Sequence, residues 1–448
     1  MICPPEAFKE LYTVNADIQN ILISPAKSFV FRSCDQFFNK VDVVLFFISH
    51  FQILLNKLLT NYLNGEDIVA SRFHYFMPRY VIYEINEKLI AECLNCIEIL
   101  EKMNVVSNID FFKDLTDKHL NRNYENIMPM LLSNSYRVLE KITEKFGGTG
   151  RQKSLFFKKH FDASNYDGLI LEALLKLKKH SLKYLKNYFS SLSLVGSLSS
   201  LDYIPGLSDM DTLLIIKRKT LLQPDILKKA RKAVLSSLPF FYWVDPLQHH
   251  GHIVISEVDL KWYPQTFFPL LLLEEGIPLG ASAQSFQYSD RDCRFERFGN
   301  AWIGTSSFMI NNKRVDRWRD PHQLKMHLQV AQLIPVLLNQ VLGIYRGKPE
   351  AFSNLKPHYS KKAWHLIEQS TRMRIDGGYN PITWEKIYKN LVTGRNPRSI
   401  QRRARRLGDA KKYLKLVLRY IGNFEDIQKL GQLFAEESVA WLKGIKTL

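Results

Sequence analysis

The spacing of apolar residues from about Phe37 to Phe146 is typical of helices, because these residues recur every three or four positions. One stretch shows the pattern well, with Ile82, Ile85, Leu89, Ile90, Cys93, Ile97 and Leu100. The pattern predicts successive amphipathic helices and therefore a helical N-terminal region over residues 1–150.

The segment 146–152, FGGTGRQ, is a strong break, since it places three glycines and a threonine together. We expect a domain boundary near residue 150. Residues 166–189 then predict one long helix, whose exposed side carries Lys176, Lys178, Lys179, Lys183 and Lys186.

After this helix the hydrophobic period changes to that of strands. Short strands are predicted at residues 191–195 (SLSLV), 211–216 (DTLLII) and 252–260 (HIVISEVDL). A helix is expected at about 224–237, where Pro224 suits a first helical turn. The order is helix, strand, loop, strand, helix, strand, which predicts a core domain over residues 151–275.

Residues 276–448 are predicted to form a mainly helical C-terminal region. The sequence is irregular and aromatic from 278 to about 319, and helical patterns follow at 322–345 and 360–374.

Length and composition support a folded protein of more than one domain. The chain has 448 residues, of which 46% are hydrophobic and 24% charged. Its formal net charge of +18 favours polyanionic partners such as RNA, DNA or nucleoside triphosphates, although a merely basic surface explains the charge equally well.

Cysteine usage points to a reducing compartment. The five cysteines are few and odd in number, so a disulfide framework is not expected, and no targeting segment is apparent. The most apolar stretches are too polar (41–59) or too short (267–273) to span a membrane. We therefore expect a cytoplasmic protein with no membrane partner.

Candidate chemistry begins with Gly196 and Ser197 at the end of a predicted strand. A glycine lets the backbone turn sharply and approach a phosphate, while the serine hydroxyl and N–H hold phosphate oxygens. Asp209 and Asp211 enter the next strand, where residues two apart point to the same face. Two such carboxylates are suitable ligands for Mg²⁺.

A two-metal site, with ions about 3.5–4 Å apart, requires a third carboxylate from a neighbouring strand. Within the predicted strand 252–260, alternation places Glu257 and Asp259 on one face, so both are sterically eligible.

Taken together, Gly196-Ser197, Ser208-Asp209-Met210-Asp211 and Val258-Asp259-Leu260 resemble the signature of the nucleotidyltransferase superfamily related to DNA polymerase beta. The resemblance implies an α+β fold, with a small mixed sheet as the nucleotidyltransferase core, flanked by helical N-terminal and C-terminal regions. Apolar neighbours on both sides make Asp259 a better match than Glu257.

The resemblance also implies the chemistry of the site. Two Mg²⁺ ions, or Mn²⁺ in their place, would be held by Asp209, Asp211 and Asp259, and Asp259 would act as the general base. A nucleoside triphosphate such as ATP would be bound by Gly196, Ser197 and Ser208.

One departure from the family concerns charge. Many members carry a basic or small polar residue shortly after the Gly-Ser pair, whereas here the sequence continues Leu198-Ser199-Ser200-Leu201. The charge of the triphosphate must then be met elsewhere, by Lys217 and Arg218 after the second strand or by lysines of the helical regions.

The expected function is transfer of a nucleoside monophosphate from a nucleoside triphosphate to an acceptor hydroxyl. The acceptor stays open among an RNA 3′ end, a small molecule such as an aminoglycoside, a protein hydroxyl and a second nucleotide. Residues 395–415, with nine basic residues and one acidic, form either a phosphate-binding face or a solvated one.

The alternative is a catalytically idle member of the superfamily that binds nucleic acid or a protein partner. The presence of all three acids argues against it, since three like charges held together carry an electrostatic cost.

Two further patterns are interpreted as structural. His249, His250 and His252 lack ligand spacing and are expected to be turn and surface residues. Cys93 and Cys96 have redox-like spacing but lie in an apolar helical pattern, so core packing is expected.

Overall fold

A computed structural model describes residues 40–65, 79–102, 104–107, 112, 124–146, 151–201, 203, 208–244, 250–265, 267–280, 285–291, 294–313, 321–376 and 419–445. The chain divides into two compact units, of which the first contains the described residues up to 291 and the second those from 294 onward. Both predicted domain boundaries, at 150 and 275, fall within the first unit.

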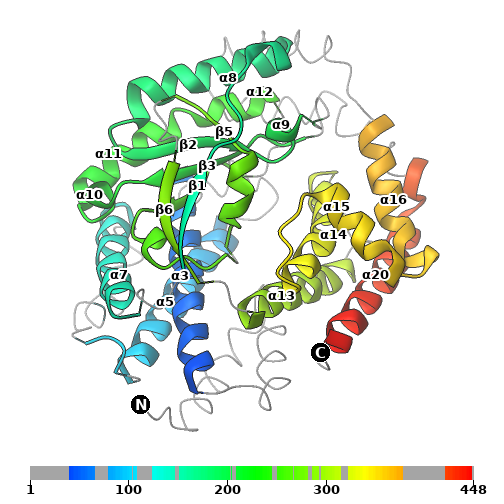
Figure 1. Cartoon of the computed structure of the whole chain (residues 1–448), viewed down its shortest axis with the longest axis horizontal. Coiled ribbons are helices and arrows are strands. Elements are labelled where there is room, and N and C mark those ends of the chain that lie inside the picture. Colours follow the sequence, from blue (N-terminus) through cyan, green and yellow to red (C-terminus); the bar gives the residue numbers. More distant parts are fainter. Residues whose placement is uncertain are drawn as a thin grey trace. The chain divides into compact units, whose positions relative to one another are not determined.

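Three long helices begin the first unit: α3 (Lys40–Asn64), α5 (Arg79–Lys102) and α7 (Tyr124–Phe146) (Figure 1). They confirm the predicted N-terminal helices, and α7 ends at the glycine-rich break. Cys93 and Cys96 are buried and free in α5, which confirms their packing in the core.

A four-stranded sheet forms the centre of this unit. Its strands are β2 (Phe189–Val195), β3 (Asp211–Ile216), β4 (Ile253–Ser256) and β5 (Ile277–Pro278), in the order β4-β3-β2-β5. β2 is antiparallel to both β3 and β5, whereas β3 and β4 are parallel. The predicted strand 211–216 is confirmed to the residue.

The predicted strand 252–260 is wrong beyond Ser256. The chain turns at Glu257 and Val258, and Asp259 begins the 3₁₀ helix η5 (Asp259–Lys261). The cause is a local ring of hydrogen bonds: the Asp259 N–H donates to Ser256 Oγ (3.1 Å), while the Ser256 N–H and hydroxyl donate to Asp259 Oδ2 (2.7 and 2.6 Å). Side-chain bonds of this kind compete with the ladder and end the strand.

Helices cover the sheet and connect its strands. The helix predicted over 166–189 ends earlier: α8 (Gly168–His180) continues as the π-helical turn η3 (Ser181–Leu185), and β2 begins at Phe189. A helix predicted at 224–237 is confirmed as α11. The connecting helices are η2 (Ala163–Asn165), α9 (Ser197–Ser200), α10 (Arg218–Leu221), α11 (Pro224–Leu235), η4 (Leu238–Phe240), α12 (Phe241–Val244) and η6 (Leu270–Glu275).

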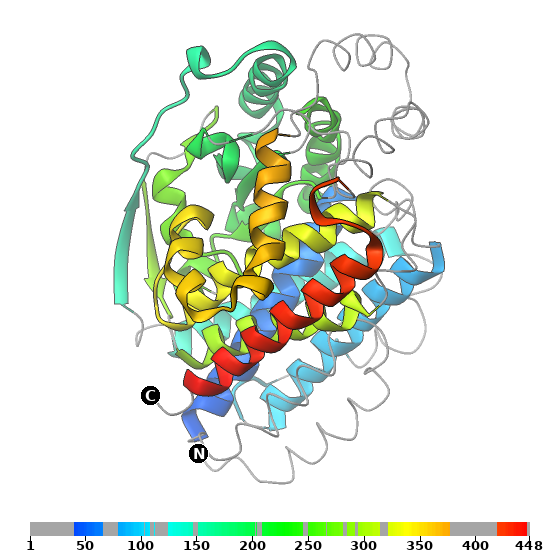
Figure 2. The same cartoon turned by 90° about the vertical axis from the view of Figure 1, so that its right-hand side faces the viewer.

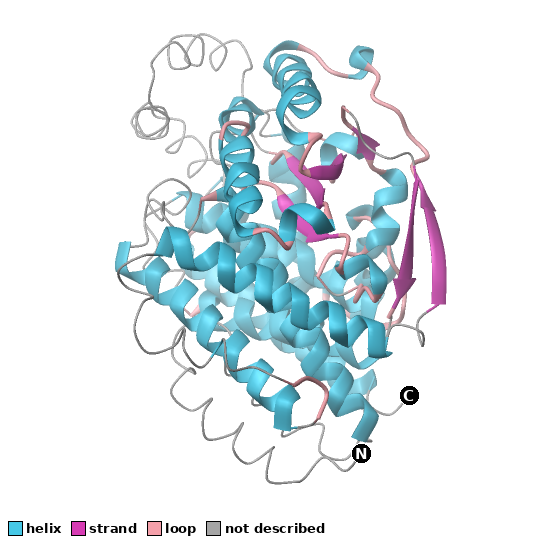
Figure 3. Cartoon of the chain, turned by 90° about the vertical axis from the view of Figure 1, so that its left-hand side faces the viewer, coloured by secondary structure: helices cyan, strands magenta, loops and turns pink. Residues whose placement is uncertain are grey.

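A second, two-stranded sheet pairs β1 (Arg151–Phe156) with β6 (Ser285–Asp290) in antiparallel register (Figure 3). A hydrophobic cluster joins residues of this ribbon to one face of the four-stranded sheet, including Leu155, Tyr288, Leu213, Ile215 and Ile255. The sequence analysis missed both strands, since β1 follows the glycine-rich break and β6 lies in the segment expected to be irregular.

The second unit is helical. Its described elements are α13 (Arg294–Asn312), α14 (Pro321–Val341), α15 (Lys348–Leu355), η8 (Lys356–His358), α16 (Lys361–Asp376) and α20 (Phe424–Ile445). α16 lies beside α20 (Figure 2). The irregular segment predicted up to 319 is wrong, because α13 occupies 19 residues of it. The basic segment 395–415 lies outside the described residues.

The architecture is therefore α+β, mostly helical with two small open sheets, as predicted at this level. Across the part of the chain that the structure describes, none of the helices has the length and apolarity needed to cross a membrane.

His252 predicts an acid-labile first unit. Its fully buried ring contacts Thr212 Oγ1 (2.7 Å) and Ser237 Oγ (2.8 Å), and burial, helped by repulsion from His180 and His250, lowers its pKa from 6.5 to about 3. The folded protein keeps His252 neutral, whereas the unfolded chain takes up a proton below pH 6.5. The free energy of unfolding should therefore fall by up to about 1.4 kcal/mol per pH unit between pH 6.5 and 3.

Urea unfolding at pH 7.5, 6.0 and 5.0 measures this effect. His252→Gln should show a smaller loss of stability on acidification than wild type, while the same change at the exposed His160 should leave the wild-type slope. Equal slopes for wild type and His252→Gln would contradict the assignment.

Candidate functional site

The Gly-Ser turn begins where β2 ends. Gly196 has φ +68° and ψ −150°, a conformation that side chains disfavour strongly. A Cβ at this position would lie 2.4 Å from Asp211 Oδ2. Glycine is therefore needed twice here, for the backbone conformation and for the close approach to the carboxylate.

The short helix α9 follows the turn and is held together by the Gly196 carbonyl. This oxygen accepts hydrogen bonds from the N–H groups of Ser199 and Ser200 (both 3.1 Å) and from their hydroxyls (2.9 and 3.1 Å). Those two hydroxyls are committed to the turn. Among the described residues, no hydrogen bond engages the Ser197 hydroxyl, which leaves it to face a ligand.

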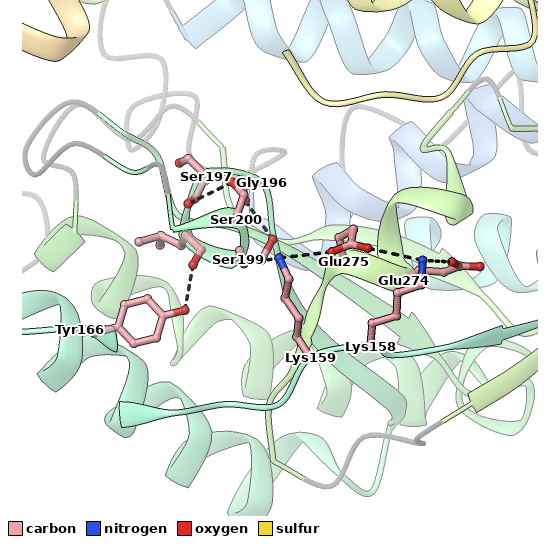
Figure 4. A network of polar contacts seen from close by, with 10 residues as sticks. Lys158, Lys159, Tyr166, Gly196, Ser197, Ser199, Ser200, Glu274 and Glu275 are labelled. Atoms are coloured by element: carbon pink, nitrogen blue, oxygen red, sulfur yellow. Dashed lines mark hydrogen bonds and ion pairs between the residues drawn. The ribbon is translucent and has the colours of Figure 1, made fainter. Parts of the chain in front are cut away.

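Two side chains from the segment after β1 hold the far end of α9 (Figure 4). The Tyr166 hydroxyl donates to the Leu198 carbonyl (2.8 Å), and Lys159 Nζ donates to the Ser199 carbonyl (3.1 Å). Lys159 also pairs with Glu275 (3.3 Å). The last carbonyls of a helix have no partner within it, so these contacts stabilise a turn too short to persist alone.

The Asp-x-Asp motif lies across from this turn. Asp211 is the first residue of β3 and pairs with Val195, the last residue of β2, so its carboxylate lies beside Gly196. Its side chain is 32% exposed, whereas Ser208, Asp209 and Met210 just before it are buried. The structure thus brings Gly196, Ser197, Asp209 and Asp211 to one edge of the sheet.

His250 joins this group, which sequence reasoning missed. Its Nε2 lies 3.0 Å from Asp211 Oδ1. Burial lowers the pKa of His250, but the hydrogen bond with Asp211 and the charges of Asp211 and Asp209 outweigh it and raise the pKa to about 9. His250 is thus a cation beside both carboxylates at neutral pH.

The interpretation of the histidine cluster as turn and surface residues is therefore wrong for two of its members. His252 is fully buried and His250 contacts Asp211, while His249 lies outside the described residues.

Asp259 does not reach the other two acids. It is fully buried, and both carboxylate oxygens accept hydrogen bonds, Oδ1 from Gln52 (2.9 Å) and Asn56 (3.4 Å) of α3 and Oδ2 from Ser256. Burial raises the pKa of Asp259, and these hydrogen bonds offset part of that effect. The expected roles of Asp259 as metal ligand and general base are not supported by this placement.

The register of the sheet explains the separation. β3 and β4 are parallel, with Leu213 opposite Ile253 and Ile216 opposite Ser256. Asp211 precedes the paired segment and Asp259 follows it, so at least five residues, or about 16 Å of strand, lie between them.

Glu257, the alternative third carboxylate, lies at the same far end as Asp259. Its Oε2 accepts the Arg218 N–H (2.8 Å), and its own N–H continues the ladder to Ile216. Lys217 and Arg218 lie there too, and Arg218 pairs with Glu140 (2.5 Å). These two cations are therefore poorly placed to meet a triphosphate held by Gly196, whereas Lys159 lies on the Gly-Ser turn.

The donor atoms decide which metal arrangement fits. Asp209 and Asp211 supply two hard oxygen donors, and Mg²⁺ commonly binds through one or two carboxylates, completing its shell with water and phosphate oxygens. Within the described part of the chain, no three His, Cys, Asp or Glu side chains are grouped so that they could hold a metal ion. The residues fit a divalent cation held by a carboxylate pair, without the expected third acid.

A separate cavity of about 600 Å³ lies between the sheet and the β1–β6 ribbon, near the carboxyl ends of β3 and β4. Its lining includes Ser190, Ile215, Glu257, Lys261, Gln287 and Tyr288. Since Glu257 lies beyond the end of β3 that is opposite Asp211, this cavity is distinct from the Gly-Ser turn.

Comparison with known proteins gives no relative: no protein-family model matches the chain, and no curated protein or solved structure does either.

The contacts of Lys159 predict its effect on α9. Lys159→Ala should increase hydrogen exchange of the Ser199 and Ser200 amides by roughly tenfold, because the turn loses a charge-assisted bond of about 1.5 kcal/mol. Lys158→Ala is the matched control, since Lys158 pairs with Glu274 (2.7 Å) and Glu275 (3.5 Å) but not with α9. Equal exchange in the two variants, followed by mass spectrometry, would show that Lys159 does not hold the turn.

Proposed function

We propose that this protein is a metal-dependent nucleotidyltransferase, which moves a nucleoside monophosphate from a nucleoside triphosphate to an acceptor hydroxyl. The supporting observation is the placement of Gly196 against Asp211 across the β2–β3 pair, where a Cβ would meet the carboxylate at 2.4 Å. A turn that admits phosphate oxygens and a carboxylate that binds a cation thereby lie side by side. The sequence motifs point to the same chemistry.

In this proposal each group at the edge of the sheet has a task. The open Ser197 hydroxyl and the backbone of the turn bind phosphate oxygens, and buried Ser208 holds the approach to Asp209. Asp209 and Asp211 hold Mg²⁺ or Mn²⁺, which when bound neutralises the phosphate and stabilises the charge that develops in transfer. His250 adds a cation to the same edge.

The acceptor is proposed to be RNA, with a small molecule as the alternative. The net charge of +18 favours a polyanion. The few cysteines, with Cys93 and Cys96 free, favour a cytoplasmic location.

A second candidate function is a catalytically idle protein of the same fold that binds nucleic acid or a protein partner. One observation favours it: His250 contacts Asp211, and Asp259 serves in a buried hydrogen-bond network instead of joining the metal site. In that case the charge pair would stabilise the sheet edge without catalysis.

Removal of either aspartate should distinguish the two functions. Asp209→Asn and Asp211→Asn should each lower transfer by at least roughly 10²–10³-fold. The fold should persist, since neither change alters side-chain volume and each reduces like-charge repulsion.

The assay combines purified protein, Mg²⁺ and each α-labelled nucleoside triphosphate with total RNA, aminoglycosides or cell protein as acceptors. Label transferred by wild type and lost in both variants supports the enzyme. Wild-type activity retained in both variants contradicts the assigned site, and no transfer to any acceptor favours the idle protein. Circular dichroism of each variant confirms that lost activity is not lost folding.

A further inference from the structure

The position that faces Asp211 on β4 cannot supply a carboxylate. Extending the parallel register back by two residues from the Leu213–Ile253 pair places Gly251 opposite Asp211. The contact of Thr212 with His252 (2.7 Å) supports this extension, because these residues come next in the same register.

Gly251 is also closed to any side chain. A Cβ there would lie 2.2 Å from Asn64 Oδ1. Asn64 cannot easily move away, because its amide accepts the His252 N–H (2.9 Å) and donates to the His252 carbonyl (2.7 Å). The neighbouring residue, His250, instead fills the space beside Asp211 Oδ1 at 3.0 Å.

From this geometry we propose that the site holds a single divalent cation, bound by Asp209 and Asp211, and that His250 occupies the place of the third carboxylate of a two-metal site. The inference rests on the proposed function and specifies the metal chemistry of the same edge. It departs from the two ions that the sequence resemblance implies.

The ligand chemistry explains why a second ion is excluded. A two-metal site needs carboxylates enough to bridge and neutralise two dications about 3.5–4 Å apart. Here two carboxylates are present, and an oxygen of one of them is hydrogen-bonded to an imidazole. The remaining acids, Glu257 and Asp259, lie at the opposite end of the parallel strands with their own partners.

The number of bound ions tests the proposal directly. Full-length protein is titrated with Mn²⁺ in the presence of a non-hydrolysable α,β-methylene analogue of ATP, and free Mn²⁺ is followed by electron paramagnetic resonance. The site's ions are counted as the difference between wild type and Asp211→Asn. We expect one ion per chain, and two ions, or none, would overturn the proposal.

Three variants assign the result to residues. Glu257→Gln and Asp259→Asn should leave the count at one, and a count that falls to zero in either folded variant would contradict the assignment. His250→Asp restores a carboxylate beside Asp211 and should raise the count to two. A count that stays at one in folded His250→Asp would show that His250 does not occupy the third position.

This measurement is independent of turnover. One ion without any label transfer would support the metal site and refute the proposed function. Label transfer with two ions would support the function and refute the single-ion site.

Discussion

The pairing of three strands determines where chemistry is feasible in the first unit. β2 runs antiparallel to β3, so the end of one strand meets the start of the next and Gly196 lies against Asp211. β4 runs parallel to β3, so its carboxyl end points away from this edge. The same pairing therefore assembles the Gly-Ser turn with the Asp-x-Asp motif and removes Asp259 from both.

Asp259 has a structural task at its own end of the sheet. It receives hydrogen bonds from Gln52 and Asn56, and Gln52 in turn accepts from Arg291 (2.8 Å), whose guanidinium lies over the Trp262 ring. A buried carboxylate is tolerated only when its oxygens are hydrogen-bonded. This network therefore joins α3, η5 and the chain after β6, and Asn64 extends the connection of α3 to the edge of β4.

The sequence predicted the local features well because each depends on neighbouring residues. The glycine turn at 196, the strand 211–216 and the helix beginning at Pro224 all follow from short patterns. The third carboxylate could not be predicted in this way. Alternation in HIVISEVDL assumed a strand of nine residues, whereas the hydrogen bonds between Ser256 and Asp259 end it after four.

Long-range pairings were also beyond the sequence. β1 pairs with β6 more than 130 residues away, and neither strand shows regular alternation over a long run. His250 carries no motif, and its importance follows only from the register that places it beside Asp211. Lys159 likewise reaches α9 from the chain after β1, about 40 residues earlier.

The central claim is that phosphate and metal bind at the edge formed by Gly196, Asp209 and Asp211. A crystal structure of the protein with Mn²⁺ and a non-hydrolysable nucleoside triphosphate tests it most directly. The account predicts anomalous density between Asp209 and Asp211, with the triphosphate against the Gly196-Ser197 turn. A nucleotide bound instead in the cavity lined by Glu257 and Lys261, with no metal at the aspartates, would contradict it.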